Sequence, residues 1–186
     1  IELIRARVDQ VPAVASCGLF VEIETLDDAA LSKWMNMLEH YGALVDDVIV
    51  AEDESSRAQL YAIRHAIPAG VNEQVVANQM PKVGTDFAVP DHELRYMMDA
   101  YESAPLPKVL FGHIGDNHLH LNLLPRNAEE LAFAKQIYAE LALMAVEVGG
   151  TVSAEHGIGK IKTRLLAEML PAGVLEDFVR LKRHLD

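Results

Sequence analysis

The segment FGHIGDNHLHLN, residues 111–122, constrains the fold of this chain more than any other. Its second half alternates polar and apolar residues, which predicts a strand with one polar face and one apolar face. The polar face of this strand carries His118, His120 and Asn122. Asp116 and Asn117 tolerate the backbone conformation of a two-residue turn, so the segment predicts a β-hairpin.

In such a hairpin His113 stands directly opposite His120. Cross-strand Cβ atoms lie about 5 Å apart, which lets two imidazoles reach one metal ion. Glu155, in the segment GGTVSAEHGIGK at residues 149–160, can add a carboxylate ligand and leave positions open for substrate. We therefore predict a metal site of His113, His120 and Glu155. The alternative is that these histidines are ordinary surface or core residues.

Three further features are candidates for function. His156 adjoins Glu155 and can act as a general base near neutral pH. Gly157 and Gly159 let the backbone approach a ligand closely, although a plain joint between a loop and a helix explains them equally well. Arg64 lies in the apolar stretch LYAIRHAI and needs a carboxylate or phosphate partner if it turns inward. A solvated arginine is the alternative.

Length and charge limit the classes of protein to consider. The 186 residues suffice for one core, and we assign residues 1–186 to a single domain. The net charge of −12 argues against a nucleic-acid partner. The one cysteine, Cys17, cannot form an intramolecular disulfide, which favours a reducing compartment and predicts a cytoplasmic protein. The sequence contains no apolar run long enough to span a bilayer.

Hydrophobic periodicity predicts an α+β fold, with helices packed on one face of an antiparallel sheet. The predicted strands are residues 18–25, 43–51, 82–89, 108–115 and 118–125. The predicted helices are residues 26–42 with a cap at Thr25, residues 55–76 with a break or kink near Pro68, residues 91–103 opened by Asp91, residues 128–148 as the longest helix with a capping box of Asn127 and Glu130, and two final helices joined at Pro171.

Several sequence blocks resemble one known family. GHIGDNHLHLN and GGTVSAEHGIG, with LFVEIET, AQLYAIRHAI and TDFAVP in matching order, are similar to the C-terminal domain of FAD-linked oxidases of the vanillyl-alcohol oxidase type. The likeness is to the branch of D-lactate, glycolate and D-2-hydroxyglutarate dehydrogenases. It implies a ferredoxin-like cap domain of an FAD enzyme that oxidises a small D-2-hydroxy acid to the 2-keto acid.

The resemblance also implies roles for single residues. His113, His120 and Glu155 match the ligands of a divalent metal, often zinc. His156 matches the group that takes the hydroxyl proton while hydride passes to the flavin. One departure lies in the same segment, because the family pattern G-D-G-N-L-H reads GDNHLH here and His118 replaces an asparagine.

Substrate and cofactor contacts follow from the same likeness. Arg64 matches an arginine that grips the substrate carboxylate, and Asn122 matches a polar group near it. The position of a family lysine falls on Gly84, so Lys82, two residues earlier, is the candidate in its place. The segment expected beside the cofactor contains Glu155, His156 and Gly157.

The flavin-binding domain of the same full-length protein is the implied partner, because in the family it precedes this region. We expect the chain alone to hold no FAD tightly and to show no turnover, and a homodimer is left open. Two other functions remain as alternatives. One is a stand-alone metal-binding or regulatory module of the same fold. The other is a zinc hydrolase that uses His113, His120 and Glu155 with a metal-bound water.

Overall fold

A computed structural model describes residues 5, 11–24, 27–171 and 173–185 of the chain. The chain divides into two compact units, residues 1–73 and residues 74–186. Each unit is described separately below, and the assignment of residues 1–186 to one domain stays a prediction. None of the described helices is both long enough and apolar enough to cross a membrane.

The first unit contains α2 (Asp28–His40), a single 3-10 turn η1 (Val45–Asp47) and the start of α3 (Glu54–Asn78). The half-buried face of α2 carries Ala30, Leu31, Trp34, Met35 and Leu38. The N-cap is Asp27, whose Oδ1 accepts a hydrogen bond of 2.7 Å from the Ala30 amide. The predicted cap, Thr25, lies outside the described residues.

Two predicted strands are wrong. Residues 18–24 are extended but pair with no strand, and they lie along α3, where the rings of Phe20 and Tyr61 are 5.5 Å apart. Glu22 accepts hydrogen bonds from Arg57 and, at 2.8 Å, from the Tyr61 hydroxyl. The contacts with α3 come from Phe20 and Glu22, whereas Leu19 and Val21 are exposed, so the alternation of apolar and acidic residues does not mark a buried face. Residues 43–51 contain only the η1 turn.

The helix does not break at Pro68, because the 25-residue α3 continues through it, and a kink there stays a prediction. Proline removes one backbone hydrogen bond from a helix interior. The half-buried side chains of Leu60, Ile63 and Ile67 lie along the helix on the N-terminal side of this proline, and their packing offsets the loss. α3 is the longest of the described helices, so the prediction that residues 128–148 form the longest helix is wrong.

The second unit is built on an antiparallel sheet whose central strand is β4 (His118–Leu123). Along one edge β4 pairs with β3 (Lys108–His113), and along the other with β1 (Val83–Gly84) and β2 (Phe87–Ala88). β1 and β2 are the predicted strand of residues 82–89, interrupted at Thr85 and Asp86. At the interruption the Leu121 amide donates to Thr85 Oγ1 over 2.9 Å, so this amide is satisfied within the irregular stretch.

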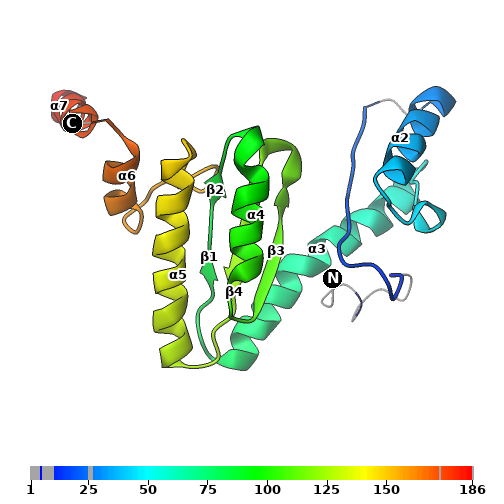
Figure 1. The fold of residues 1–186 in the computed structure, drawn as a ribbon, viewed down its shortest axis with the longest axis horizontal. Helices are drawn as coiled ribbons and strands as arrows, with labels where there is room; N and C mark the ends of the chain where they lie inside the picture. Colours follow the sequence, from blue (N-terminus) through cyan, green and yellow to red (C-terminus); the bar gives the residue numbers. More distant parts are fainter. Residues whose placement is uncertain (1–4, 6–10, 25–26, 172, 186) are drawn as a thin grey trace. The chain divides into compact units, whose positions relative to one another are not determined.

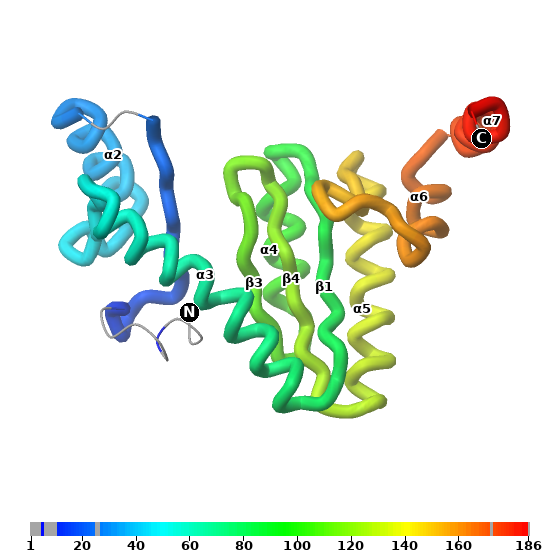
Figure 2. Tube along the Cα trace, turned by 180° about the vertical axis from the view of Figure 1, so that it is seen from behind, coloured from blue at the N-terminus to red at the C-terminus, as the bar shows by residue number. Residues whose placement is uncertain are grey.

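Helices cover one face of this sheet, as predicted. α4 (Leu94–Ser103) follows a 3-10 turn, η2 (Asp91–Glu93), so Asp91 opens that turn and not the α-helix itself. α4 and α5 (Ala128–Glu147) lie on the same side of the strands, as the opposite views of Figures 1 and 2 show. Their core side chains meet the apolar face of β4 in one cluster, which includes Leu119, Leu121, Leu123, Met97, Tyr101, Ile137 and Leu141.

The cap of α5 is half of the predicted capping box. Asn127 Oδ1 accepts from the Glu130 amide over 2.9 Å, whereas the Glu130 carboxylate accepts from the amide and the guanidinium of Arg126. Two final helices, α6 (Thr163–Met169) and α7 (Val174–Leu185), flank Pro171 as predicted. The leucines of β4 face the helices, and the histidines of β4 lie on the opposite face of the strand.

Candidate functional site

The β3–β4 hairpin has a longer connection than the sequence predicts. A 3-10 turn η3 (Ile114–Asp116) comes first, and Asn117 then adopts a left-handed backbone with φ of 50°. The register pairs His113 with His118 and Phe111 with His120. The prediction that His113 stands opposite His120 is wrong, because the η3 turn moves the pairing by two residues.

The histidines nevertheless gather on one face. The rings of His118 and His120 are 4.3 Å apart at their centroids, and the rings of His120 and His156 are 5.2 Å apart. The His113 ring lies 6.1 Å from that of His118 and nearly parallel to it. Four imidazoles from two segments of the chain thus form one row, of which only His118 is fully buried.

Gly112 allows this hairpin to close. A Cβ atom at residue 112 would lie 2.4 Å from the His118 carbonyl oxygen and 2.8 Å from Leu119 Cα. Both neighbours are backbone atoms of β4, which cannot rotate away. Only glycine permits the two strands to approach this closely beside His113.

A buried carboxylate, Asp86, connects the histidine row to the loop at residues 153–156. Its Oδ1 lies 3.0 Å from His118 Nε2 and accepts from the Glu155 amide over 3.2 Å. Its other donors are Ser153 Oγ at 3.2 Å, the His156 amide at 3.1 Å and Lys162 Nζ at 2.5 Å. The side chain of Asp86 is 4% exposed and that of Lys162 is 12% exposed.

The charges follow from this packing. Burial alone raises the pKa of Asp86, but the hydrogen bond from Lys162 and the amides of Glu155 and His156 outweigh it and hold that pKa at about 2. Burial lowers the pKa of His118, and the neighbouring His120 lowers it further. The pKa of Glu155 is lowered, because the hydrogen bond with His120 and the nearby histidines outweigh partial burial. At neutral pH both carboxylates are ionised.

His120 is held in the orientation of a metal ligand. Its Nδ1 lies 2.9 Å from the Thr85 carbonyl oxygen, which can only accept, so Nδ1 carries the proton. In the neutral ring Nε2 then presents a lone pair, and it faces Glu155 Oε1 at 3.0 Å. Two acceptors at this distance require a proton or a metal ion between them. Adjacent ligands of a tetrahedral zinc ion lie about 3.3 Å apart, given Zn–N bonds of about 2.0 Å.

The described residues contain two overlapping groups whose ligand atoms lie within 4.8 Å of one another. One is His118, His120 and Glu155, and the other is Asp86, His120 and His156. His113 belongs to neither group, but its Nε2 is 3.9 Å from Glu155 Oε2. Imidazoles with carboxylates are a donor set that suits zinc and similar divalent ions. The residues present therefore fit a divalent metal.

The cluster opens into a cavity of about 410 Å³, large enough for a small organic acid. Its lining includes His113, Asp116, His118 and Glu155. The side chain of His156 is 64% exposed and its Nε2 lies 3.4 Å from Glu155 Oε1. The site can therefore combine a cation held by imidazoles with an accessible base.

The other predicted site residues have distinct positions. Lys82 Nζ donates to Asn122 Oδ1 over 2.7 Å, and Asn122 is buried on the histidine face of β4. Partial burial lowers the pKa of Lys82. Gly157 has φ of +71° on the loop directly after His156. Arg64 is an exposed residue of α3 in the first unit.

Sequence reasoning missed four residues that hold the site together. They are Thr85, Asp86, Ser153 and Lys162. One signal for Asp86 was present, since an acidic residue within the apolar stretch VGTDFAV is costly to bury without partners. Its partner Lys162 lies 76 residues later and showed no pattern of its own.

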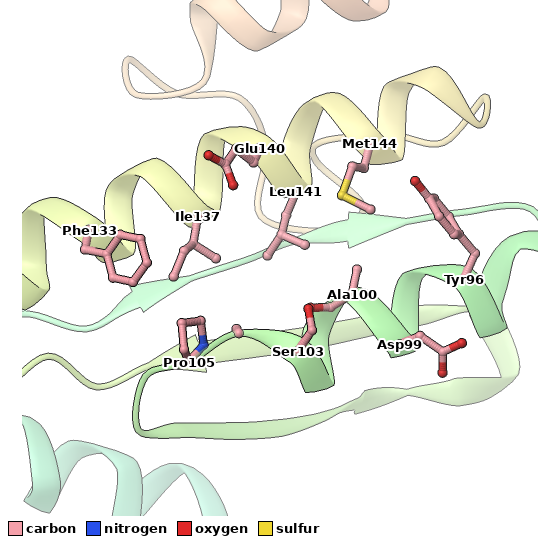
Figure 3. Close-up of a pocket in the computed structure, with 11 residues that line it drawn as sticks. Tyr96, Asp99, Ala100, Ser103, Pro105, Phe133, Ile137, Glu140, Leu141 and Met144 are labelled. Carbon is pink, nitrogen blue, oxygen red and sulfur yellow. The ribbon is translucent and has the colours of Figure 1, made fainter.

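A second concavity of about 420 Å³ lies between α4 and α5 (Figure 3). Phe133, Ile137 and Leu141 of α5 point toward α4 in this groove. Its carboxylates are Asp99 and Glu140, and no imidazole lines it. The histidine cavity, although of similar size, is the one that carries groups for chemistry.

Comparisons with known proteins identify the family of this chain. The model of the family "FAD linked oxidases, C-terminal domain" matches residues 2–186. A D-lactate dehydrogenase of Anaerostipes hadrus is 32% identical over 67% of this chain and 27% of its own length. The glycolate oxidase subunit GlcD of Bacillus subtilis is 28% identical over 77% of this chain and 29% of its own length.

A D-2-hydroxyglutarate dehydrogenase of Xanthomonas citri pv. viticola is 30% identical over 77% of this chain and 31% of its own length. The chain thus spans about a third or less of these relatives. The match of the family model over nearly all residues decides the assignment. This chain belongs to the family of FAD-linked oxidase C-terminal domains.

Proposed function

We propose that this chain is the substrate-binding and catalytic half of an FAD-dependent dehydrogenase that oxidises a D-2-hydroxy acid to the 2-keto acid. The three relatives named above act, by their names, on lactate, glycolate or hydroxyglutarate, all of which are 2-hydroxy acids. The observation that carries the proposal is the convergence of His120 and His156 on Glu155, which lines an open cavity together with His113 and His118.

A divalent metal would be held by His120 and Glu155 with a third imidazole from the β3–β4 hairpin. His113, the third ligand predicted from the sequence, lies 3.9 Å from Glu155 and stays a prediction. A divalent ion bound here supplies a Lewis acid that lowers the pKa of the substrate hydroxyl. Thr85 and Asp86 fix the two rings and the loop that surround it.

His156 takes the hydroxyl proton, because it is accessible and an imidazole accepts protons near neutral pH. FAD, when bound by the flavin-binding domain, would supply the acceptor for the C2 hydride, so that loss of this hydride and of the hydroxyl proton would leave the 2-keto acid. Glu155, His156 and Gly157 form the segment beside the cofactor. The flavin-binding domain of the full-length protein completes the enzyme.

Asn122 and Lys82 bind the substrate carboxylate from the floor of the histidine face. Their side chains are 2.7 Å apart, so an anion can accept from both the ammonium and the amide. Arg64 lies on α3 in the first unit, and its role as a contact to the substrate carboxylate stays a prediction. A bidentate arginine contact is the usual way in which proteins grip a carboxylate.

Zinc content tests the proposal on the 186-residue chain. After saturation with Zn²⁺ and removal of free metal, we expect about one ion per wild-type chain and far less in His120→Ala. His92→Ala is the matched control, because His92 is an exposed histidine that forms an ion pair with the adjacent Glu93. Equal zinc content in the wild type and His120→Ala would remove His120 from the site.

Substrate class is tested on the zinc-loaded chain by NMR titration with D-lactate and D-2-hydroxyglutarate. We expect saturable shifts at β4 and at residues 153–157, weakened about tenfold or more in Lys82→Met, since a charged contact to the carboxylate is lost. L-enantiomers and a simple carboxylate such as acetate serve as comparison ligands. Binding of none of the 2-hydroxy acids would contradict the proposed substrate class.

A further inference from the structure

We propose that Lys162 is a positioning residue, whose ammonium holds the Asp86 carboxylate against the loop that carries Glu155 and His156. The proposal rests on the proposed function, in which His156 is the base, and it adds a residue that acts through others. Lys162 Nζ donates to Asp86 Oδ2 over 2.5 Å and lies 3.2 Å from Ser153 Oγ. Lys162 is not among the residues that line the histidine cavity.

The backbone of Lys162 is fixed by the core of the second unit. Lys162 directly precedes α6, and its carbonyl oxygen accepts from the Leu166 amide over 2.9 Å. Leu165 and Met169, on the same helix, pack against the core cluster. The ammonium therefore extends from an anchored point, and the lysine side chain is 12% exposed.

The segment between His156 and Lys162 has few contacts of its own. A Cβ atom at Gly157 or Gly159 would meet nothing within 4 Å, and the side chain of Ile161 is 91% exposed. Packing within this segment thus does little to orient His156. The stronger constraint comes from Asp86, which accepts from the Glu155 and His156 amides on one side and from Lys162 on the other.

The charge of Lys162 keeps Asp86 in this role. The Asp86 side chain is 4% exposed, and an ionised carboxylate at such a depth needs a cation beside it. Without the ammonium, Asp86 would gain a proton or move toward water. Either change would weaken its bonds to the two amides, because ionised acceptors form the stronger hydrogen bonds. Lys162→Met should therefore release Glu155 and His156 although it removes no direct contact of either residue.

Amide hydrogen exchange in the metal-free 186-residue chain tests the proposal. In Lys162→Met, the Glu155 and His156 amides should exchange about tenfold or more faster relative to the Leu121 amide of β4. The Ala154 amide is an internal reference, because it donates over 3.0 Å to the backbone carbonyl of Asp86 and not to the carboxylate. Its exchange should change less than about threefold.

Two further variants separate charge from other effects. Lys162→Arg retains the positive charge and should restore part of the protection at residues 155 and 156. Lys160→Met is the matched control, since Lys160 is an exposed lysine in the same loop, and it should leave that protection unchanged. As a second signature, the ¹³C shifts of His156 should move toward those of an unstructured chain in Lys162→Met, while those of His92 stay constant.

Unchanged exchange at residues 155 and 156 in Lys162→Met would overturn the proposal. Acceleration only in step with Leu121 would also overturn it, because Lys162 would then stabilise the fold as a whole. These measurements need neither metal nor substrate. Failure of the zinc or 2-hydroxy acid titrations would therefore contradict the proposed function and leave the placement of the loop by Lys162 standing.

Discussion

Asp86 shows how one residue can organise a site without entering the chemistry. A carboxylate offers about four lone pairs, and all of them are used here by donors from three distant segments. These donors are His118, Ser153, the amides of Glu155 and His156, and Lys162. A buried carboxylate of this kind contributes little net free energy to folding while it is paired, but its loss leaves several buried donors without an acceptor.

Asp86→Asn should therefore lower the free energy of unfolding by about 3–5 kcal/mol, because the Lys162 ammonium then remains buried without a carboxylate. Urea denaturation followed by circular dichroism measures the loss. Asp177→Asn is the matched control, since Asp177 pairs with Arg180 at 66% exposure and should cost less than about 1 kcal/mol. Equal losses in the two variants would show that the buried Asp86 network contributes no more to the free energy of unfolding than an exposed ion pair.

The acid sensitivity of the fold should come partly from the same group. The pKa of Asp86 falls from the usual 3.8 to about 2 on folding. Between these values the unfolded chain binds more protons, so stability is complete above about pH 4 and declines as pH falls toward 2. A difference of this size corresponds to about 2 kcal/mol.

Unfolding free energies at pH 5, 4, 3 and 2 can test this expectation. The wild type should lose about 2 kcal/mol more than Asp86→Asn over the range from pH 4 to pH 2. A parallel decline in both proteins would assign the acid sensitivity to other carboxylates.

At the scale of elements, the β3–β4 hairpin determines which side chains can meet. β4 alternates as the sequence predicts, because the apolar face has a core to enter and the polar face does not. The register was not predictable, since Asn117 and the η3 turn leave four connecting residues where two were expected. Register depends on the turn geometry, which Asp-Asn specifies less strictly than Asn-Gly.

Gly112→Ala should disrupt this hairpin. The added methyl group would lie 2.4 Å from the backbone of His118, so β3 and β4 would have to separate, at a cost of about 1–3 kcal/mol. Thermal unfolding and Zn²⁺ affinity should both decline. Gly115→Ala is the control in the same hairpin, because nothing lies within 4 Å of its added Cβ. Similar effects of the two substitutions would contradict the close approach of the strands.

A predicted strand failed to form where no other strand lay beside it to pair with. Residues 18–24 alternate like a strand but pack beside α3, whereas residues 82–89 form β1 and β2 because β4 is there to receive them. Helices were easier to predict, since their hydrogen bonds are internal, and α5 ends within one residue of the expectation. The Asp86–Lys162 pair depends on tertiary structure alone and left no periodic signal.

At the scale of the whole molecule, the two units have very different cores. In residues 74–186 the cluster around Leu121 and Ile137 joins the sheet to α4 and α5. Among the described residues of the first unit, Val71 is the one apolar side chain, glycine aside, that is fully buried. Since burial of apolar surface is the main source of stability, the first unit should unfold at a lower free energy than the second.

The single tryptophan makes this difference measurable. Trp34 lies on α2 in the first unit, whereas Tyr101 and Phe87 are buried in the second. In a urea titration, Trp34 fluorescence should change at a lower midpoint than the hydrogen-exchange protection of the β4 amides, because two cores of unequal size need not melt together. Trp34→Phe should remove the early fluorescence transition and leave the protection of β4 unchanged. Coincident midpoints would instead show that the two units unfold as one cooperative structure, with α3 coupling them across the boundary that it spans.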